Sequence, residues 1–310
     1  MTLTVGLPAI RRWRPDWPCD PYDVLRPLRR GSCDPTFQLD PDGTVWRAVL
    51  TPDGPTTMRI VRRAPVGEIE IAAWGLGAPW LLDRAPAMLG ADDDVSSFDP
   101  SSPVVRSAWT RNPHWRVPST GRVLEALVPA VIEQKVTGRE AWLGWRRLVS
   151  RFGQPAPGPG AERGLKTPPD APTLASIPSW EWLRCHIDGA RSQTIVRAAR
   201  VADSLERTVG LASDEVERRL RSVPGVGAWT AAEVRQRAHG DADAVSFGDY
   251  HIARHVGWAM TGEEIDDDAL ADLLEPDRPH RYRVQHVVTT RLPGRPRRGP
   301  RMAQRRHLPR

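Results

Sequence analysis

One change in the spacing of apolar residues divides this 310-residue chain and limits the folds open to it. Residues 36–74 hold four short β-prone runs separated by the turn sequences DPDG and TPDGP, which is typical of an antiparallel sheet. From Gly121 onward, apolar residues recur at steps of three and four, as they do in amphipathic helices. We therefore predict an α+β protein in which a small N-terminal antiparallel β-rich domain precedes an all-α domain.

The same pattern sets the expected boundaries. A short helix is expected over residues 83–90, and the proline- and glycine-rich stretch 154–172 is expected to form a loop. The predicted domains are an N-terminal α+β domain over 1–110, a helical domain over 111–288 and a basic Arg/Pro-rich tail over 289–310.

Positive charge is concentrated at the C-terminus. The chain has 44 basic and 38 acidic residues, a balance of +6, and residues 291–310 contain eight arginines and no acid, so the remainder carries −2. Such a segment cannot bury apolar surface and is expected to be disordered, serving either as a salt-sensitive nucleic-acid contact or only as a solubilising end. Only two of the basic residues are lysines, a bias that a GC-rich genome produces, so arginine content alone is weak evidence for a nucleic-acid partner.

Several classes of protein are excluded at this stage. No stretch approaches the ~18 consecutive apolar residues of a membrane helix, and the N-terminus lacks the features of a secretory signal. Cys19, Cys33 and Cys185 are not spaced as a disulfide framework or a metal site. We expect a cytoplasmic bacterial protein without membrane contact, associated with the nucleoid if it binds DNA.

The most informative segment is 222–232, SVPGVGAWTAA. Pro224 ends the preceding helix, and Gly225 and Gly227 allow a tight turn at dihedral angles closed to other residues. The next helix begins at once, so backbone N–H groups at the turn point outward and suit a DNA phosphate. The alternative is an ordinary connection between two helices closed by glycines.

A second segment, VSFGDYHIARHV, places Asp249 twenty positions after Trp229 at the start of a helix. The pair of segments closely resembles the helix-hairpin-helix superfamily of DNA base-excision glycosylases, and within it the bacterial 3-methyladenine DNA glycosylase II type of the alkylation-repair branch. ALVPAVIEQKVTGREA and PYD at 21–23 add weaker similarity, so the resemblance covers roughly residues 20–285.

The resemblance implies a catalytic role for Asp249, whose carboxylate would stabilise the positive charge that develops on deoxyribose as the base leaves. The residue also suits a helix N-cap, and both roles are compatible. Trp229 stands where relatives that also cut the DNA backbone carry a lysine, which implies a monofunctional enzyme. Trp229 would also line the pocket for an extruded base, where aromatic rings favour a cationic alkylated base.

Other roles are implied by the same resemblance. The DNA-contacting set would comprise Gln134, Lys135, Gly225, Val226, Gly227 and Thr230. Lys135 occupies the position of the apolar residue that fills the gap left by the flipped base, and Glu133 replaces a glycine; both depart from the family pattern. Tyr250 and Tyr282 would join Trp229 in the base pocket, with His280 standing where an aromatic residue is expected.

No metal or cofactor is predicted, because His251 and His255 lie four residues apart without a third ligand at suitable spacing. In the family that the chain resembles, main-chain carbonyls of the hairpin can also hold a monovalent cation, and carbonyls occur at every residue, so the sequence carries no signal for that site. The leading hypothesis is a monomeric, monofunctional glycosylase that removes alkylated purines from double-stranded DNA. The alternatives are the same fold acting on deaminated or oxidised bases, and a non-catalytic lesion-binding module.

Overall fold

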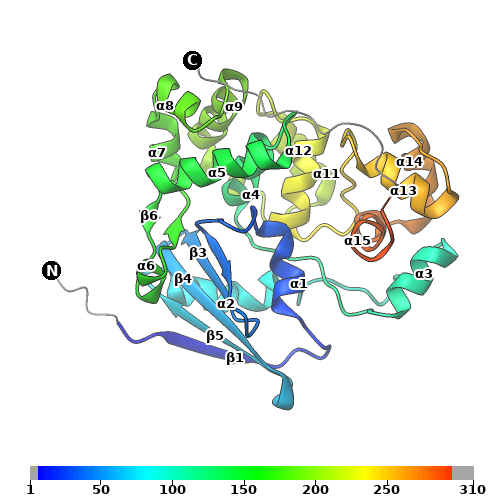
Figure 1. Cartoon of the computed structure of the whole chain (residues 1–310), viewed down its shortest axis with the longest axis horizontal. Coiled ribbons are helices and arrows are strands. Elements are labelled where there is room, and N and C mark those ends of the chain that lie inside the picture. The colour runs from blue at the N-terminus through cyan, green and yellow to red at the C-terminus, as the bar shows by residue number, and fades with distance from the viewer. Residues whose placement is uncertain (1–5, 295–310) are drawn as a thin grey trace.

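A computed structural model describes residues 6–294, and Figure 1 shows an N-terminal sheet beneath two groups of helices. The sheet has five antiparallel strands in the order β1-β5-β4-β3-β2. Its strands are β1 (Ala9–Trp13), β2 (Phe37–Leu39), β3 (Val45–Thr51), β4 (Gly54–Arg63) and β5 (Glu68–Trp74). The four predicted β-prone runs form β2 to β5, and the predicted α+β class is confirmed.

The edge strand β1 was not predicted, because its sequence AIRRW lies largely exposed and lacks an alternating apolar face. Its charged side chains instead contact acidic residues of β5: the Arg12 guanidinium lies 3.5 Å from the Glu70 carboxylate. Charged edge strands of this kind discourage pairing with other chains.

Both faces of the sheet are covered. One face packs on α2 (Ala78–Met88), which begins before the expected residue 83 because Ala78, Leu81 and Leu82 already face the sheet. The other face, with Trp46 and Trp74, is covered by the segment that was expected to be a loop. That prediction was wrong in part: the segment holds β6 (Gln154–Pro155), α6 (Pro159–Glu162) and β7 (Lys166–Thr167), since β6 pairs with β7.

The larger helical group surrounds α4 (Val123–Ile132), in which every residue except Glu125 is buried. Glu125 forms an ion pair with Arg47 of β3 and so joins this group to the sheet. The helices of this group are α4, α5 (Gly138–Phe152), α7 (Ala171–Ser176), α8 (Ser179–Arg184), α9 (Gly189–Arg200), α10 (Ala202–Glu206), α11 (Ser213–Arg221), α12 (Ala228–Val234) and the π-helical turn η3 (Arg235–His239).

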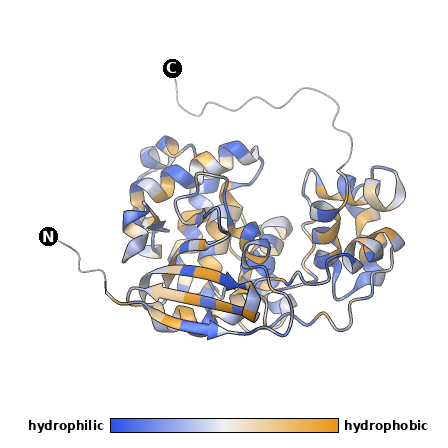
Figure 2. Ribbon diagram, turned by 60° about the horizontal axis from the view of Figure 1, so that its bottom comes forward, coloured by the Kyte–Doolittle hydropathy of each residue, from blue (hydrophilic) through white to orange (hydrophobic). Residues whose placement is uncertain are grey.

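The smaller helical group has its own apolar core and stands apart from the larger group in Figure 2. It comprises α3 (Pro103–Thr110), α13 (Ile252–Thr261), α14 (Asp267–Leu274) and α15 (Arg281–Arg291). Short elements complete the fold: α1 (Pro21–Leu25), η1 (Arg26–Leu28), η2 (Ala64–Val66) and η4 (Glu275–Asp277).

The domain division stays a prediction. Within the expected N-terminal domain 1–110, α3 packs on helices from the far end of the chain through Val105 and Ala108. The expected tail begins inside α15, and its residues 295–310 lie outside the described part of the chain. None of the helices that are described is long and apolar enough to cross a membrane.

Candidate active site at the hairpin and the loop before α13

The hairpin between α11 and α12 depends on one glycine rather than two. Gly225 has φ +100°, and a Cβ atom there would lie 2.0 Å from Oγ1 of Thr194 on α9. Gly227 has φ −93° and ψ −177°, an extended conformation that any residue adopts, and a Cβ atom there would have no other atom within 4 Å. The expectation of special dihedral angles was therefore wrong for Gly227, where the missing side chain instead leaves exposed backbone uncovered.

Gln134 ties the hairpin to the end of α4. Its Nε2 donates to the Gly225 carbonyl at 3.0 Å and to Oγ1 of Thr230 at 2.8 Å. Thr230 is buried, and Val226 places its side chain in the core of the larger helical group. Among the predicted DNA contacts, Gln134 and Thr230 thus bind each other and shape the turn, while exposed backbone remains at Gly225 and Gly227.

Lys135 lies next to this turn, exposed and in the left-handed region at φ +54°. Residues other than glycine rarely adopt this left-handed conformation, and they keep it only where the surrounding structure fixes it. Two residues later, Thr137 caps α5 in a capping box with Glu140. On the other side, the Glu133 carboxylate forms an ion pair with Arg30 at 3.1 Å.

Asp249 has its carboxylate fixed by three N–H donors. Oδ1 accepts from the backbone N–H groups of His251 at 2.7 Å and Ile252 at 3.2 Å, the N-cap residue and the first residue of α13, and so binds the N-terminal end of that helix. Oδ2 accepts from the indole Nε1 of Trp229 at 3.1 Å. The two residues twenty positions apart in sequence are therefore in direct contact, and the cap leaves one carboxylate edge turned to the hairpin helix.

The other predicted pocket residues do not join this pair. Tyr250 is 70% exposed, with the guanidinium of Arg254 4.4 Å from its ring. Tyr282 is buried against Trp115, and burial raises the pKa of its hydroxyl to about 12. His280 is also buried, with Nε2 2.9 Å from the Ser97 hydroxyl. The structure thus brings together Trp229 and Asp249, but not the aromatic set expected around them.

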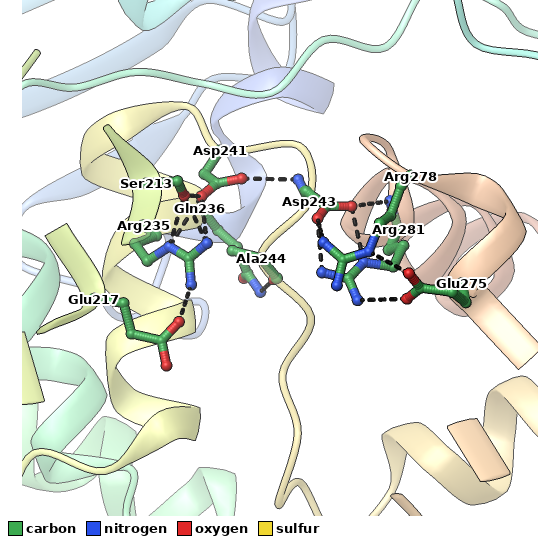
Figure 3. A network of polar contacts seen from close by, with 10 residues as sticks. All are labelled: Ser213, Glu217, Arg235, Gln236, Asp241, Asp243, Ala244, Glu275, Arg278 and Arg281. Atoms are coloured by element: carbon green, nitrogen blue, oxygen red, sulfur yellow. Dashed lines mark hydrogen bonds and ion pairs between the residues drawn. The ribbon is translucent and has the colours of Figure 1, made fainter. Parts of the chain in front are cut away.

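The segment from Asp241 to Asp249 connects the two helical groups, and its first three residues form ion pairs with both groups (Figure 3). Asp241 forms an ion pair with Arg235 of η3 at 2.7 Å. Burial acts to raise the pKa of Asp241, but the Arg235 guanidinium and the hydrogen bonds from Ser213 and the Asp243 backbone together outweigh it, so this pKa lies below the ordinary value. Asp243 binds Arg281 of α15 at 2.7 Å and Arg278 at 3.1 Å.

Sequence reasoning missed a group of buried polar residues next to this segment: Glu233, Gln236, Ser246 and Gln285. A signal was present for Glu233 and Arg237, which follow Trp229 at steps of four and so lie on its face of the helix. Their side chains pair at 2.7 Å and are about one-tenth exposed. The described residues contain no group of three or more His, Cys, Asp or Glu side chains arranged for a metal ion.

The five-stranded sheet and the helical body form a fold that solved DNA glycosylases share. No family model matches the chain. In sequence it is 29% identical over 205 residues to a probable bifunctional transcriptional activator/DNA repair enzyme AlkA of Mycobacterium tuberculosis, an alignment covering 65% of this chain and 38% of that relative.

Solved structures share the fold at low identity. A 3-methyladenine DNA glycosylase of Archaeoglobus fulgidus has a TM-score of 0.73 at 16% identity, covering 90% of this chain and 96% of that one. An 8-oxoguanine glycosylase/lyase of Clostridium acetobutylicum has a TM-score of 0.69 at 11% identity, covering 93% and 100%. The predicted resemblance to helix-hairpin-helix glycosylases, on the alkylation-repair side, is confirmed.

Proposed function

We propose that this protein is a monofunctional DNA glycosylase of base excision repair that removes alkylated purines of the 3-methyladenine type. It flips the damaged base from double-stranded DNA, hydrolyses the N-glycosidic bond and leaves an abasic site. The observation that carries the proposal is the Asp249 carboxylate, held by three N–H donors beside an exposed glycine hairpin. A fixed anion stabilises the oxocarbenium-like transition state without reorganising as the base leaves.

The surroundings of Asp249 support DNA as the substrate. The exposed backbone at Gly225 and Gly227 allows close approach of a phosphate, which binds without reading the base sequence. Lys135 projects beside the hairpin, where its aliphatic stem fills the place of the flipped base and its amine reaches the DNA backbone. The protein acts as a monomer and without a cofactor.

The residue at position 229 argues against strand cleavage. A lyase needs an amine that forms a Schiff base with the sugar, whereas Trp229 offers only an indole N–H, already donated to Asp249. The proposed product is therefore an intact strand with an abasic site.

A second candidate substrate class has one observation in its favour. The helix face that carries Trp229 continues into the ion pair of Glu233 and Arg237, whose side chains are about one-tenth exposed. Charged groups suit a base recognised by hydrogen bonds, as oxidised and deaminated bases are, better than a cationic alkylpurine held by stacking.

The test is release of free base from methylated duplex DNA, resolving 3-methyladenine from 7-methylguanine. Wild type should release base, and strand cuts should appear only after alkali. Asp249→Asn should release none while binding DNA as tightly or more tightly, because a negative charge near phosphates is lost. Release by Asp249→Asn at the wild-type rate would remove this carboxylate from the reaction, and release only from oxidised or deaminated duplexes would favour the second class.

A further inference from the structure

Ser246 is the centre of a buried hydrogen-bond network three residues before Asp249. Its hydroxyl donates to Oε1 of Glu233 at 2.8 Å and accepts from Nε2 of Gln236 at 2.8 Å and of Gln285 at 3.1 Å. Its backbone N–H donates to Oε1 of Gln285 at 3.0 Å. The side chain is 1% exposed, so one donor and two acceptors of the hydroxyl are all used inside the protein.

The partners of Ser246 come from both helical groups. Glu233 lies on α12 and Gln236 on η3, whereas Gln285 lies on α15. Gln236 also donates to the Ala244 carbonyl at 2.7 Å, as Figure 3 shows. A π-helical turn such as η3 shifts the side chains that follow it relative to an α-helix, and such turns are frequent at functional sites. The loop is therefore held at two successive points where it passes between the groups.

The bond between Glu233 and Ser246 joins the same helix and the same loop as the bond between Trp229 and Asp249. Trp229 and Glu233 are four residues apart on one face of α12, and they bind Asp249 and Ser246, which are three residues apart in the loop. The backbone N–H of Asp249 also donates to the Ser246 carbonyl at 3.2 Å. Helix and loop are thus joined by two adjacent side-chain hydrogen bonds, and only the one from Trp229 reaches the carboxylate assigned to catalysis.

We propose that Ser246 is a positioning residue that holds the Asp249 carboxylate in register with the Trp229 indole. Without its hydroxyl, the Glu233 carboxylate and two amides lose a shared partner, and the loop can slide along α12. The second Glu233 oxygen remains bound by Arg237, so the loss is confined to the loop side of the pair. The expected loss of base-release rate rests on the proposed glycosylase function. The expected displacement of the Asp249 carboxylate from the Trp229 indole does not depend on that function.

The experiment compares wild type with Ser246→Ala by three measurements. In single-turnover base release at saturating DNA, we expect a rate ten- to hundredfold lower, with the Kd for the same duplex within twofold. In an ¹⁵N spectrum of the indole N–H groups, the Trp229 signal, identified by its loss in Trp229→Phe, should move towards a non-hydrogen-bonded position. The matched control is Ser192→Ala, a buried serine whose hydroxyl bonds only a carbonyl of its own helix, α9.

The outcomes separate the two proposals. A wild-type protein that releases no base overturns the proposed function, and the indole signal alone then decides the role of Ser246. An unmoved Trp229 signal in Ser246→Ala overturns the positioning role, whatever the rate. Equal losses of rate and DNA affinity also overturn it, since they indicate general damage to the fold rather than displacement of one carboxylate.

Discussion

Two alanine substitutions in the hairpin, Gly225→Ala and Gly227→Ala, are chemically identical but should have opposite effects. At Gly225 the added methyl group meets Oγ1 of Thr194 at 2.0 Å and its Cβ at 3.0 Å, and the residue keeps φ at +100°. The left-handed backbone costs an L-residue about 1–2 kcal/mol. Displacing Thr194, which also bonds the Ala190 carbonyl, adds about 1–3 kcal/mol of overpacking.

Gly225→Ala should therefore lose about 2–5 kcal/mol of unfolding free energy. Gly227→Ala, in extended backbone with open space around it, should keep its stability or gain about 0.4–1 kcal/mol from a less flexible unfolded chain. Its methyl group nevertheless covers the exposed turn, so under the proposed function its affinity for duplex DNA should fall about tenfold, or about 1.4 kcal/mol.

Urea unfolding followed by far-ultraviolet circular dichroism measures the first effect, and duplex binding at fixed salt measures the second. Adding Thr194→Ala to Gly225→Ala should recover the overpacking part alone, because the backbone conformation is unchanged. The predicted contrast is refuted if Gly225→Ala unfolds at the wild-type urea concentration. It is equally refuted if Gly227→Ala loses as much stability as Gly225→Ala.

Three further predictions test other parts of the chain. Lys135→Gly should relieve left-handed strain and stabilise the fold by about 1 kcal/mol while lowering base release; thermal melts and release assays check both, and a destabilised variant would contradict the strain. Deleting residues 295–310, which leaves α15 intact, should flatten the slope of log affinity against log salt by about 0.9 for each DNA phosphate that the tail neutralises; an unchanged slope means that the tail does not bind DNA. Burial lowers the pKa of His239 to about 4 from 6.5, so the neutral imidazole is favoured in the folded protein. The free energy of unfolding that this difference contributes is complete above pH 6.5 and is lost as the pH falls towards 4. By pH 5 this costs about 2 kcal/mol; His239→Gln should weaken the pH dependence of urea midpoints, and an unchanged dependence would assign it to other groups.

Local sequence patterns predicted the elements that rest on local physics. Turn sequences between β-prone runs located four strands, because turns and alternation are properties of a few neighbouring residues. The edge strand β1 escaped, since its pairing with β5 joins residues 9–13 to residues 69–73 and leaves no alternating pattern. The strands and helix within residues 154–167 were not predicted for the same reason, because the structure of this segment depends on its packing against the sheet face with Trp46 and Trp74.

In the candidate site, too, sequence spacing predicted one contact, whereas the contacts between distant parts of the chain were not predictable. The interval from Trp229 to Asp249 pointed to a pair, and the two side chains are in contact. The DNA contact expected of Gln134 stays a prediction, and the bond of its amide to a carbonyl 91 residues away is a contact that no local pattern encodes. Tyr282 was expected in the base pocket as the displaced aromatic residue of the last core helix; the structure shows its ring against Trp115, and its role in a pocket stays a prediction.

The buried polar residues around the loop between Asp241 and Asp249 explain why an aspartate bound to the N-terminal end of α13 does not by itself make this site. A cap fixes one carboxylate oxygen relative to its own helix, α13, which belongs to the smaller helical group. The hairpin belongs to the larger group, so under the proposed function the carboxylate faces DNA beside the hairpin only if the loop between the groups is fixed to both. Ser246 provides that connection through Glu233 on one side and Gln285 on the other. A protein that kept the hairpin and Asp249 but had alanine at position 246 should therefore bind damaged DNA and release the damaged base slowly.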